Sequence, residues 1–203
     1  MDILTLKSKV KLGCNLCDKC CVYRGDIRLL PINVWKISKY LNISVNEFLE
    51  RYTDRLKGNK LELVLKTTGD LKQCILYDEN GKKCGIHPVK PLQCVMFPLV
   101  PENLKRDYFI DSEQCKLEDA NEITVNEWVN GNNNIYKKNI KICMEWIQFI
   151  EWAQIKIEDF SDEKINILYK TLFENNNPKK WNMKMQMKKN MWKAEKLIKE
   201  YSK

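Results

Sequence analysis

The sequence predicts an α+β fold: a small cysteine-rich core with a short β-meander or hairpin, flanked by several α-helices and a basic C-terminal helix. Eight of the nine cysteines lie within the first 115 residues, among turn-rich and alternating segments. The later part carries apolar residues at helical spacing, and the end is rich in lysine. We therefore expect a cysteine-rich domain over 1–120, a helical buttress over 121–177 and a basic amphipathic helix over 178–203.

The first cysteines of the chain form a cluster of four within eight residues: Cys14, Cys17, Cys20 and Cys21. Thiolates are soft ligands for zinc, copper(I) and iron–sulfur clusters. The first three have the C-x2-C-x2-C spacing that opens a bacterial ferredoxin motif, but the fourth cysteine and the proline of that motif are absent. Neighbouring residues of an extended chain point to opposite sides. Cys20 and Cys21 therefore either serve two metal centres, or one binds metal while the other packs.

Two helices are expected next. An apolar stripe at helical spacing predicts the first over Ile32–Leu41, with Pro31 near its first turn. Ser44 and Glu47 form a capping-box pattern, which predicts a second helix that runs to about Tyr52.

Strands are expected in the middle of the chain. Alternating leucines predict one over Lys60–Thr67, and Leu71–Tyr77 is a second. Asp78–Gly81 ends in Asn-Gly, which tolerates the positive φ of a hairpin turn. The returning strand covers Lys82–Ile86, and Tyr108–Asp111 is a further candidate. Three cysteines of this region are evenly spaced, but the sequence around them does not match, so no internal repeat is predicted.

The second half is predicted to be helical. Thr124 and Glu127 form another capping box. Ile135 to about Phe160 is the most apolar helical stretch and is expected to be a buried buttress. A shorter helix is expected over about Ser161–Glu174.

The formal net charge of +8 is concentrated near the C-terminus. From Pro178 onward there are nine lysines and two acids, which leaves +1 for the rest of the chain. On a helix, six residues of this tail form one stripe that is expected to dock on the body: Met183, Met187, Met191, Ala194, Ile198 and Tyr201. Trp181, Met185 and Trp192 then lie nearly opposite. The lysines then face water, so binding of nucleic acid or of an acidic protein is a hypothesis for the tail alone.

No run of about 18 apolar residues occurs, so no membrane-spanning helix is predicted. The N-terminus lacks the basic and apolar regions of a signal peptide. We therefore expect a cytoplasmic protein without membrane contact. Thiols usually stay reduced in that compartment, which favours metal ligation over disulfides; intracellular proteins of hyperthermophiles are the exception.

The candidate metal and cofactor ligands are eight cysteines: Cys14, Cys17, Cys20, Cys21, Cys74, Cys84, Cys94 and Cys115. One or two of Cys74, Cys84 and Cys115 could instead be reduced core residues. Cys143 lies inside the apolar helix and is expected to be a small hydrophobe. His87, the only histidine, is expected to be a loop residue, with completion of a metal site as the alternative. No catalytic acid–base pair is readable.

The order of these cysteines carries a resemblance. C-x2-C-x2-CC is followed by Cys74, by Cys84-Gly85-Ile86-His87-Pro88, by Cys94 with Phe97-Pro98, and by Cys115. Over about residues 12–118 this resembles the YkgJ-type CxxCxxCC family, which is described as zinc- or iron-chelating and includes the flagellin lysine N-methylases. The resemblance implies eight metal-ligand candidates and, for some relatives, an iron–sulfur cluster. His87, Lys90 and Val95 stand where the family commonly has Tyr, Arg and Arg.

All-sulfur ligation suits both zinc and iron–sulfur clusters. Structural zinc sites usually pair two C-x2-C knuckles, and no second C-x2-C follows residue 21. Single dispersed cysteines after a C-x2-C-x2-C head fit an iron–sulfur cluster better. We expect a 4Fe–4S cluster, with zinc as the alternative.

Two functions follow as hypotheses. The first is an iron–sulfur protein with redox or protein-modifying, methylase-like activity, acting on a protein substrate. The second is a module with structural zinc that binds a protein or nucleic-acid partner through its basic C-terminal helix. The residues alone leave open whether the protein is an enzyme.

Overall fold

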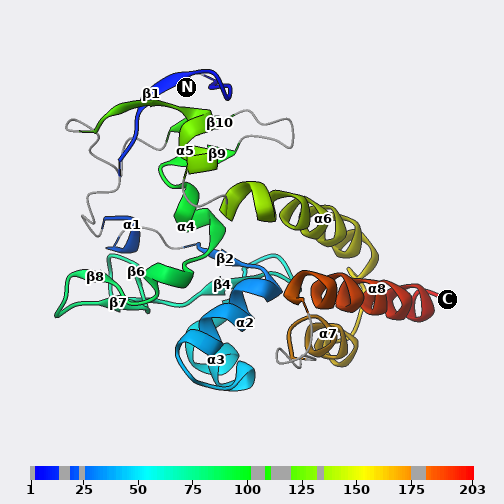
Figure 1. Cartoon of the computed structure of the whole chain (residues 1–203). Helices are drawn as coiled ribbons and strands as arrows, with labels where there is room; N and C mark the ends of the chain where they lie inside the picture. Colours follow the sequence, from blue (N-terminus) through cyan, green and yellow to red (C-terminus); the bar gives the residue numbers. More distant parts are fainter. Residues whose placement is uncertain are drawn as a thin grey trace. The chain divides into compact units, whose positions relative to one another are not determined.

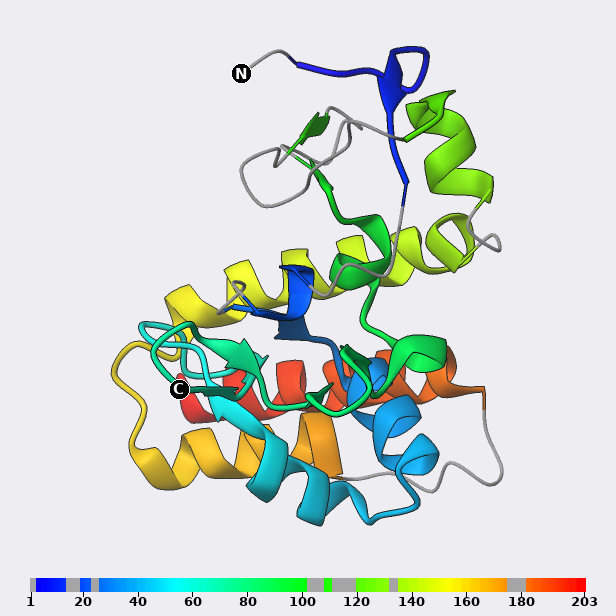
Figure 2. The same cartoon turned by 90° about the vertical axis from the view of Figure 1, so that its left-hand side faces the viewer.

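The computed structural model describes residues 3–13, 19–22, 26–101, 108–110, 120–131, 135–174 and 182–203, so Cys14, Cys17 and Cys115 lie outside it. Two compact units are distinguished: unit 1 is Met1–Ile27 with Thr67–Lys141, and unit 2 is Arg28–Lys66 with Ile142–Lys203. Helices and small antiparallel strand pairs both contribute, which confirms the α+β class (Figures 1 and 2). The predicted domain boundaries at residues 120 and 177 stay a prediction, because the two compact units do not show which segments fold independently.

Unit 2 contains a three-stranded antiparallel sheet, in which β4 (Leu63–Leu65) lies between β2 (Arg28–Leu29) and β3 (Thr53–Arg55). All three residues of β4 are buried. The strand predicted over Lys60–Thr67 is therefore shorter than expected, and it is covered on both faces.

The two predicted helices of this unit are confirmed as α2 (Pro31–Tyr40) and α3 (Val45–Tyr52). Ser44 Oγ accepts a hydrogen bond from the Glu47 N–H at 3.1 Å, as expected for the N-cap of α3.

Further helices complete unit 2. The apolar stretch forms α6 (Ile135–Lys156), whose residues from Ile142 onward belong here. It is followed by α7 (Asp162–Tyr169), which continues into the π-helix η2 (Lys170–Glu174), and by α8 (Met183–Tyr201). The helix predicted over Ser161–Glu174 is confirmed, although its last part has π rather than α geometry.

Aromatic side chains join these helices to α2. The Trp35 side chain is 1% exposed, and its Nε1 donates to the carbonyl oxygen of Phe173 at 3.0 Å. The Phe173 ring in turn meets the Trp146 ring edge-on, with 5.8 Å between the centroids. The π-helix therefore presents both a ring and a backbone carbonyl to the core of unit 2.

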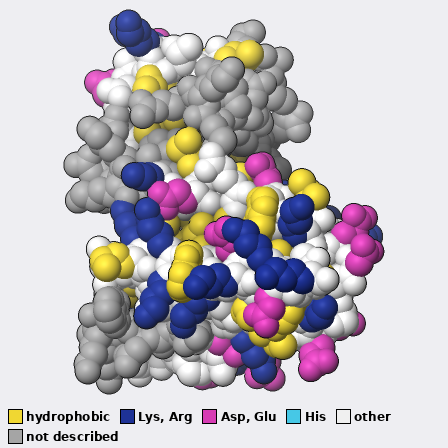
Figure 3. All heavy atoms as spheres, turned by 90° about the vertical axis from the view of Figure 1, so that its right-hand side faces the viewer, with side chains coloured by type: hydrophobic (Ala, Val, Ile, Leu, Met, Phe, Trp, Pro, Cys, Tyr) yellow, Lys and Arg dark blue, Asp and Glu magenta, His cyan; other side chains and the backbone are white. Residues whose placement is uncertain are grey.

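The centre of the predicted stripe of α8 is buried, with Met187, Ala194 and Ile198 at most 1% exposed. The other stripe residues, Met183, Met191 and Tyr201, are half-buried. Met185 and Trp192 lie on the opposite side and are 57% and 54% exposed. Seen from the side toward which α8 ends, the surface carries Lys and Arg side chains interspersed with acidic and apolar ones (Figure 3). This face is therefore mixed in charge rather than uniformly basic.

One polar residue of α8 is buried with the stripe, and the sequence pattern did not predict it. Asn190 is fully buried. Its Nδ2 donates to the carbonyl oxygen of Leu172 at 3.3 Å, and its Oδ1 accepts from Gln186 Nε2 at 2.9 Å. These bonds satisfy an amide that would otherwise destabilise the core.

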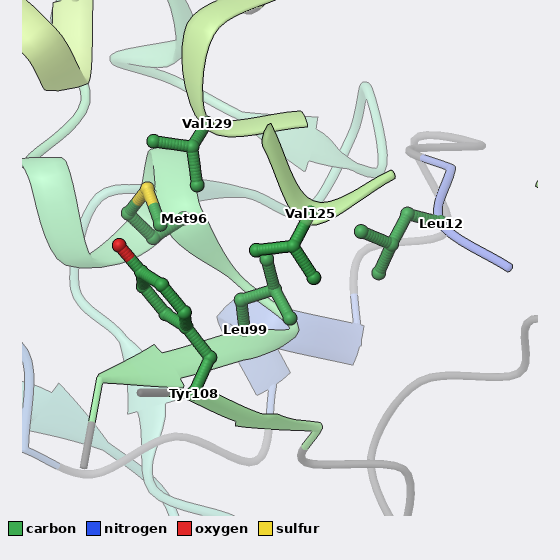
Figure 4. Packing of buried hydrophobic residues seen from close by; sticks show 6 residues of the cluster. All are labelled: Leu12, Met96, Leu99, Tyr108, Val125 and Val129. Carbon is green, nitrogen blue, oxygen red and sulfur yellow. The ribbon is translucent and has the colours of Figure 1, made fainter. Parts of the chain in front are cut away.

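Short strands organise much of unit 1. β1 (Lys9–Lys11) pairs antiparallel with β11 (Glu122–Thr124), and β9 (Leu99–Pro101) pairs with β10 (Tyr108–Ile110), the strand predicted at Tyr108. Buried side chains from these strands and their neighbours form one apolar cluster (Figure 4): Leu12, Met96, Leu99, Tyr108, Val125 and Val129.

The second predicted capping box begins α5 (Val125–Gly131). The Thr124 N–H donates to Glu127 Oε2 at 2.7 Å, and the Glu127 N–H donates to Thr124 Oγ1 at 3.1 Å. Trp128 Nε1 donates to the carbonyl oxygen of Met96 at 3.1 Å, which ties α5 to α4 (Leu92–Met96).

Candidate metal centre

Two successive hairpins of unit 1 carry two of the predicted ligands. In the first, β5 (Thr67–Thr68) pairs with β6 (Gln73–Cys74). In the second, β7 (Tyr77–Asp78) pairs with β8 (Lys83–Cys84). In each hairpin the cysteine ends the second strand and faces the first residue of the first strand.

The backbone of this region repeats every ten residues. Lys72 and Lys82, each two residues before a cysteine, both have positive φ, at 51° and 46°. The prediction of no internal repeat is therefore wrong for the segment around Cys74 and Cys84. The two segments share a lysine two residues before the cysteine and an aliphatic residue two residues after it, and the repeat is clearer in the backbone conformation than in this short match of residue types.

The strand predicted over Leu71–Tyr77 is also wrong. Leu71 and Lys72 belong to the turn of the first hairpin, and Ile75 and Leu76 link the two hairpins. The physical reason is the positive φ of Lys72, which an extended strand does not allow. Leu71, counted as a strand residue, is 57% exposed.

Backbone amides donate to both sulfur atoms. The N–H of Leu76 is hydrogen-bonded to Cys74, and the N–H of Ile86 to Cys84. Both donors lie two residues after their cysteine. Hydrogen bonds of this kind favour the thiolate, which is the form that binds metal. Sequence reasoning missed these donors; the equal cysteine spacing was the signal that pointed to them.

Gly85 allows the second hairpin to approach the link between the two. Its N–H donates to the carbonyl oxygen of Leu76 at 2.9 Å. A Cβ at this position would stand 2.8 Å from that oxygen, which is closer than real Cβ atoms approach. A glycine directly after Cys84 is therefore a packing requirement of the site.

The short helix α1 (Lys19–Val22) lies against β6 and brings two more thiols to the hairpins. The thiol of Cys21 is hydrogen-bonded to Cys20 and to Cys84. Cys74 is within electrostatic range of Cys84 and Cys20. The chain is helical here and not extended, so Cys20 and Cys21 reach the same group of thiols instead of opposite sides.

The thiols of this group differ in proton affinity. Hydrogen bonds to Cys20 and Cys84, together with burial, raise the pKa of Cys21. The hydrogen bond from Cys21 lowers the pKa of Cys84 to about 7, with help from the Ile86 N–H and the Lys90 ammonium. Burial raises the pKa of Cys74 to about 11. Of Cys21, Cys74 and Cys84, Cys84 is therefore the thiol that ionises most readily near neutral pH.

The all-sulfur donor set of this group fits a soft metal. Cys21, Cys74 and Cys84 carry reduced thiols. Within the described ranges, no three His, Cys, Asp or Glu side chains are already arranged to hold a metal ion.

The remaining predicted positions are more scattered. Cys94 is half-buried on α4 of unit 1. Cys143 is half-buried on α6 in unit 2, where burial raises its pKa to about 12 although Lys184 and Lys36 act in the opposite direction. His87 is an exposed residue of the 3₁₀ turn η1 (His87–Val89), and its Nε2 lies 3.3 Å from Lys90 Nζ.

Residues 13–116 match the family model CxxCxxCC, described as "Putative zinc- or iron-chelating domain". The matched range covers half of the chain and contains all four interacting thiols. The chain belongs to the CxxCxxCC family.

A CxxCxxCC chain of this kind has an archaeal relative, the uncharacterized protein MJ0661 of Methanocaldococcus jannaschii. It is 36% identical over 89 residues, which are 42% of this chain and 43% of the relative. This chain therefore matches less than half of the length of that protein. No solved structure matches the present chain. Among the described helices of this CxxCxxCC protein, none is long and apolar enough to cross a lipid bilayer.

Proposed function

We propose that this CxxCxxCC protein binds a 4Fe–4S iron–sulfur cluster through cysteine thiolates. The observation that carries the proposal is the mutual interaction of Cys20, Cys21, Cys74 and Cys84. The remaining ligand candidates are Cys14, Cys17, Cys94 and Cys115. A reducing compartment such as the cytoplasm suits thiols kept available for metal.

The chain's own groups prepare the site for metal. Cys84, with its pKa lowered to about 7, gives up its proton more readily than Cys21 or Cys74, and the Cys21 thiol is hydrogen-bonded to it. The amide N–H groups of Leu76 and Ile86 stay on the sulfurs and favour their charged form. Single dispersed ligands after the C-x2-C-x2-C head favour a cluster over a zinc knuckle.

We extend the proposal to a redox or protein-modifying, methylase-like activity on a protein substrate. A bound cluster would supply electron transfer. Lys90 acts electrostatically on Cys84 and contacts the exposed His87, so these two side chains are available beside the thiols to hold an acidic substrate or move a proton.

Purification without oxygen tests the metal assignment. A brown protein with broad visible absorbance and matching amounts of iron and sulfide supports the cluster. A colourless protein with stoichiometric zinc rejects it and favours structural zinc.

Structural zinc with partner binding through α8 is the second candidate, motivated by the exposed lysines of that helix. Two of them already have acidic neighbours, with Lys188 Nζ 2.8 Å from Glu145 Oε1 and Lys199 Nζ 2.5 Å from Glu195 Oε1. A polyanion would have to compete with these pairs, and its binding should weaken steeply with salt. Equal binding in low and high salt would reject this candidate.

A further inference from the structure

A groove in unit 2 runs between α6 and α8 and has a volume of about 410 Å³. Its apolar lining comes from Phe149, Trp152, Met191 and Trp192. Two carboxylates, Glu145 and Glu195, and the ammonium of Lys188 also border it. Sites that hold small organic ligands have volumes of this order.

The aromatic rings have faces that attract positive charge. The Phe149 and Trp152 rings are tilted neighbours, with 6.1 Å between their centroids. Trp192 is 54% exposed. The Lys196 ammonium already stands 3.8 Å from the centroid of its ring, and Lys196 is not one of the groove-lining residues. A cation over an indole face is the strongest form of this interaction.

In the described part of the chain, each carboxylate has a lysine partner in a partly exposed ion pair. Glu145 pairs with Lys188, and Glu195 pairs with Lys199 one turn along the same helix. Exposed pairs of this kind contribute little to stability. A second ammonium group could therefore share or replace either lysine at small cost.

We propose that this groove binds an alkylammonium group, as found in a quaternary amine or a protonated lysine side chain. The electron-rich ring faces hold the charged head and Met191 contacts its methyl or methylene groups. Glu145 and Glu195 neutralise the charge from the rim. An anion would instead meet ring faces and two carboxylates, with Lys188 as its favourable partner among the described lining residues.

Tryptophan side-chain NMR tests the proposal on the full-length protein. The ¹⁵N-labelled indole signals are assigned by single Trp→Phe variants and titrated with tetramethylammonium, with lysine methylamide, and with the neutral isostere of choline, 3,3-dimethylbutan-1-ol. We expect saturable shifts of Trp152 and Trp192 with the ammonium probes only. The Trp35 and Trp128 signals serve as internal references because their Nε1 atoms donate to Phe173 and Met96. The stronger of the two ammonium probes identifies the source of the ligand.

Variants make the result specific to the groove. Trp192→Leu, read through the Trp152 signal, should weaken ammonium binding roughly tenfold. Met185→Leu is the matched control, since Met185 is equally exposed on the same helix but does not line the groove. The combined Glu145→Gln and Glu195→Gln variant should weaken binding further. Equal shifts with the neutral isostere, shifts with pyrophosphate in place of ammonium, or no saturable shift at all would each overturn the proposal.

Discussion

Cys84 in the second hairpin and Cys143 in α6 are both half-buried and both have lysines nearby, yet their pKa values move in opposite directions. Cys84 receives hydrogen bonds from Cys21 and from the Ile86 N–H, and its pKa falls to about 7. At Cys143, burial outweighs Lys184 and Lys36, and the pKa rises to about 12. The comparison teaches that direct hydrogen bonds to the sulfur lower the pKa of a thiol more effectively than a nearby cation does. A thiol with such bonds is ready to bind metal as a thiolate, whereas a packed thiol without them stays protonated.

The largest effect is expected when single cysteine sulfurs are replaced by oxygen. We expect Cys84→Ser and Cys21→Ser to lose most of the bound metal, because each removes a member of the interacting thiol group. Cys143→Ser is the control and should keep its metal. Iron, sulfide and zinc are measured after purification without oxygen. Full metal retention in both Cys84→Ser and Cys21→Ser would contradict the assignment.

Alkylation of the metal-free protein sharpens the comparison. At pH 7 about half of Cys84 is thiolate, against on the order of one molecule in 10⁵ for Cys143. A lowered pKa means that the thiolate forms as the pH rises through that lower value. Labelling of Cys84 by iodoacetamide should therefore level off above about pH 8, while labelling of Cys143 keeps rising. Peptide mass spectrometry measures both rates, and equal rates at pH 7 would refute the difference.

A methyl group at Gly85 tests whether hairpin packing sets the sulfur geometry. Gly85→Ala places a Cβ 2.8 Å from the Leu76 carbonyl oxygen, so the backbone around Cys84 must shift. We expect a loss of about 1–3 kcal/mol in the free energy of unfolding and weaker metal retention. Glu79→Ala, at an exposed position of the same hairpin, is the matched control. Urea unfolding and metal analysis are the measurements; identical behaviour of the two variants would exclude the packing argument.

The smallest effect is expected at Cys143 itself. Cys143→Ala removes a half-buried sulfur and should cost about 1 kcal/mol in the free energy of unfolding, as a small core truncation. Metal content should not change, because the four interacting thiols belong to unit 1. Loss of metal in this variant would mean that α6 contributes to the centre.

Features encoded by neighbouring residues were predictable. Ser44 and Thr124 mark their helices because an N-cap is a contact over three residues, and the stripe of α8 follows from helical spacing alone. The eight candidate ligands could be named from spacing and resemblance. Which of them interact could not be predicted, because the contact of Cys21 with Cys84 joins residues 63 positions apart through the packing of α1 on β6. The positive φ of Lys72 interrupts a predicted strand. It could not be predicted from the residue type, because positive φ is typical of glycine and not of lysine.

Asn190 has a consequence for how α8 is seated. If the helix slid by one turn, Gln186 or Ala194 would take its place and its amide would leave the Leu172 carbonyl, so a misaligned docking loses that buried hydrogen bond. The bond from Gln186 lies within α8 and would move with the helix. Apolar contacts alone discriminate poorly between such positions, since Met187, Ala194 and Ile198 all tolerate an apolar neighbour. A single buried amide therefore sets the alignment of α8. Because Trp192 is two residues further along, the same amide keeps that indole facing outward.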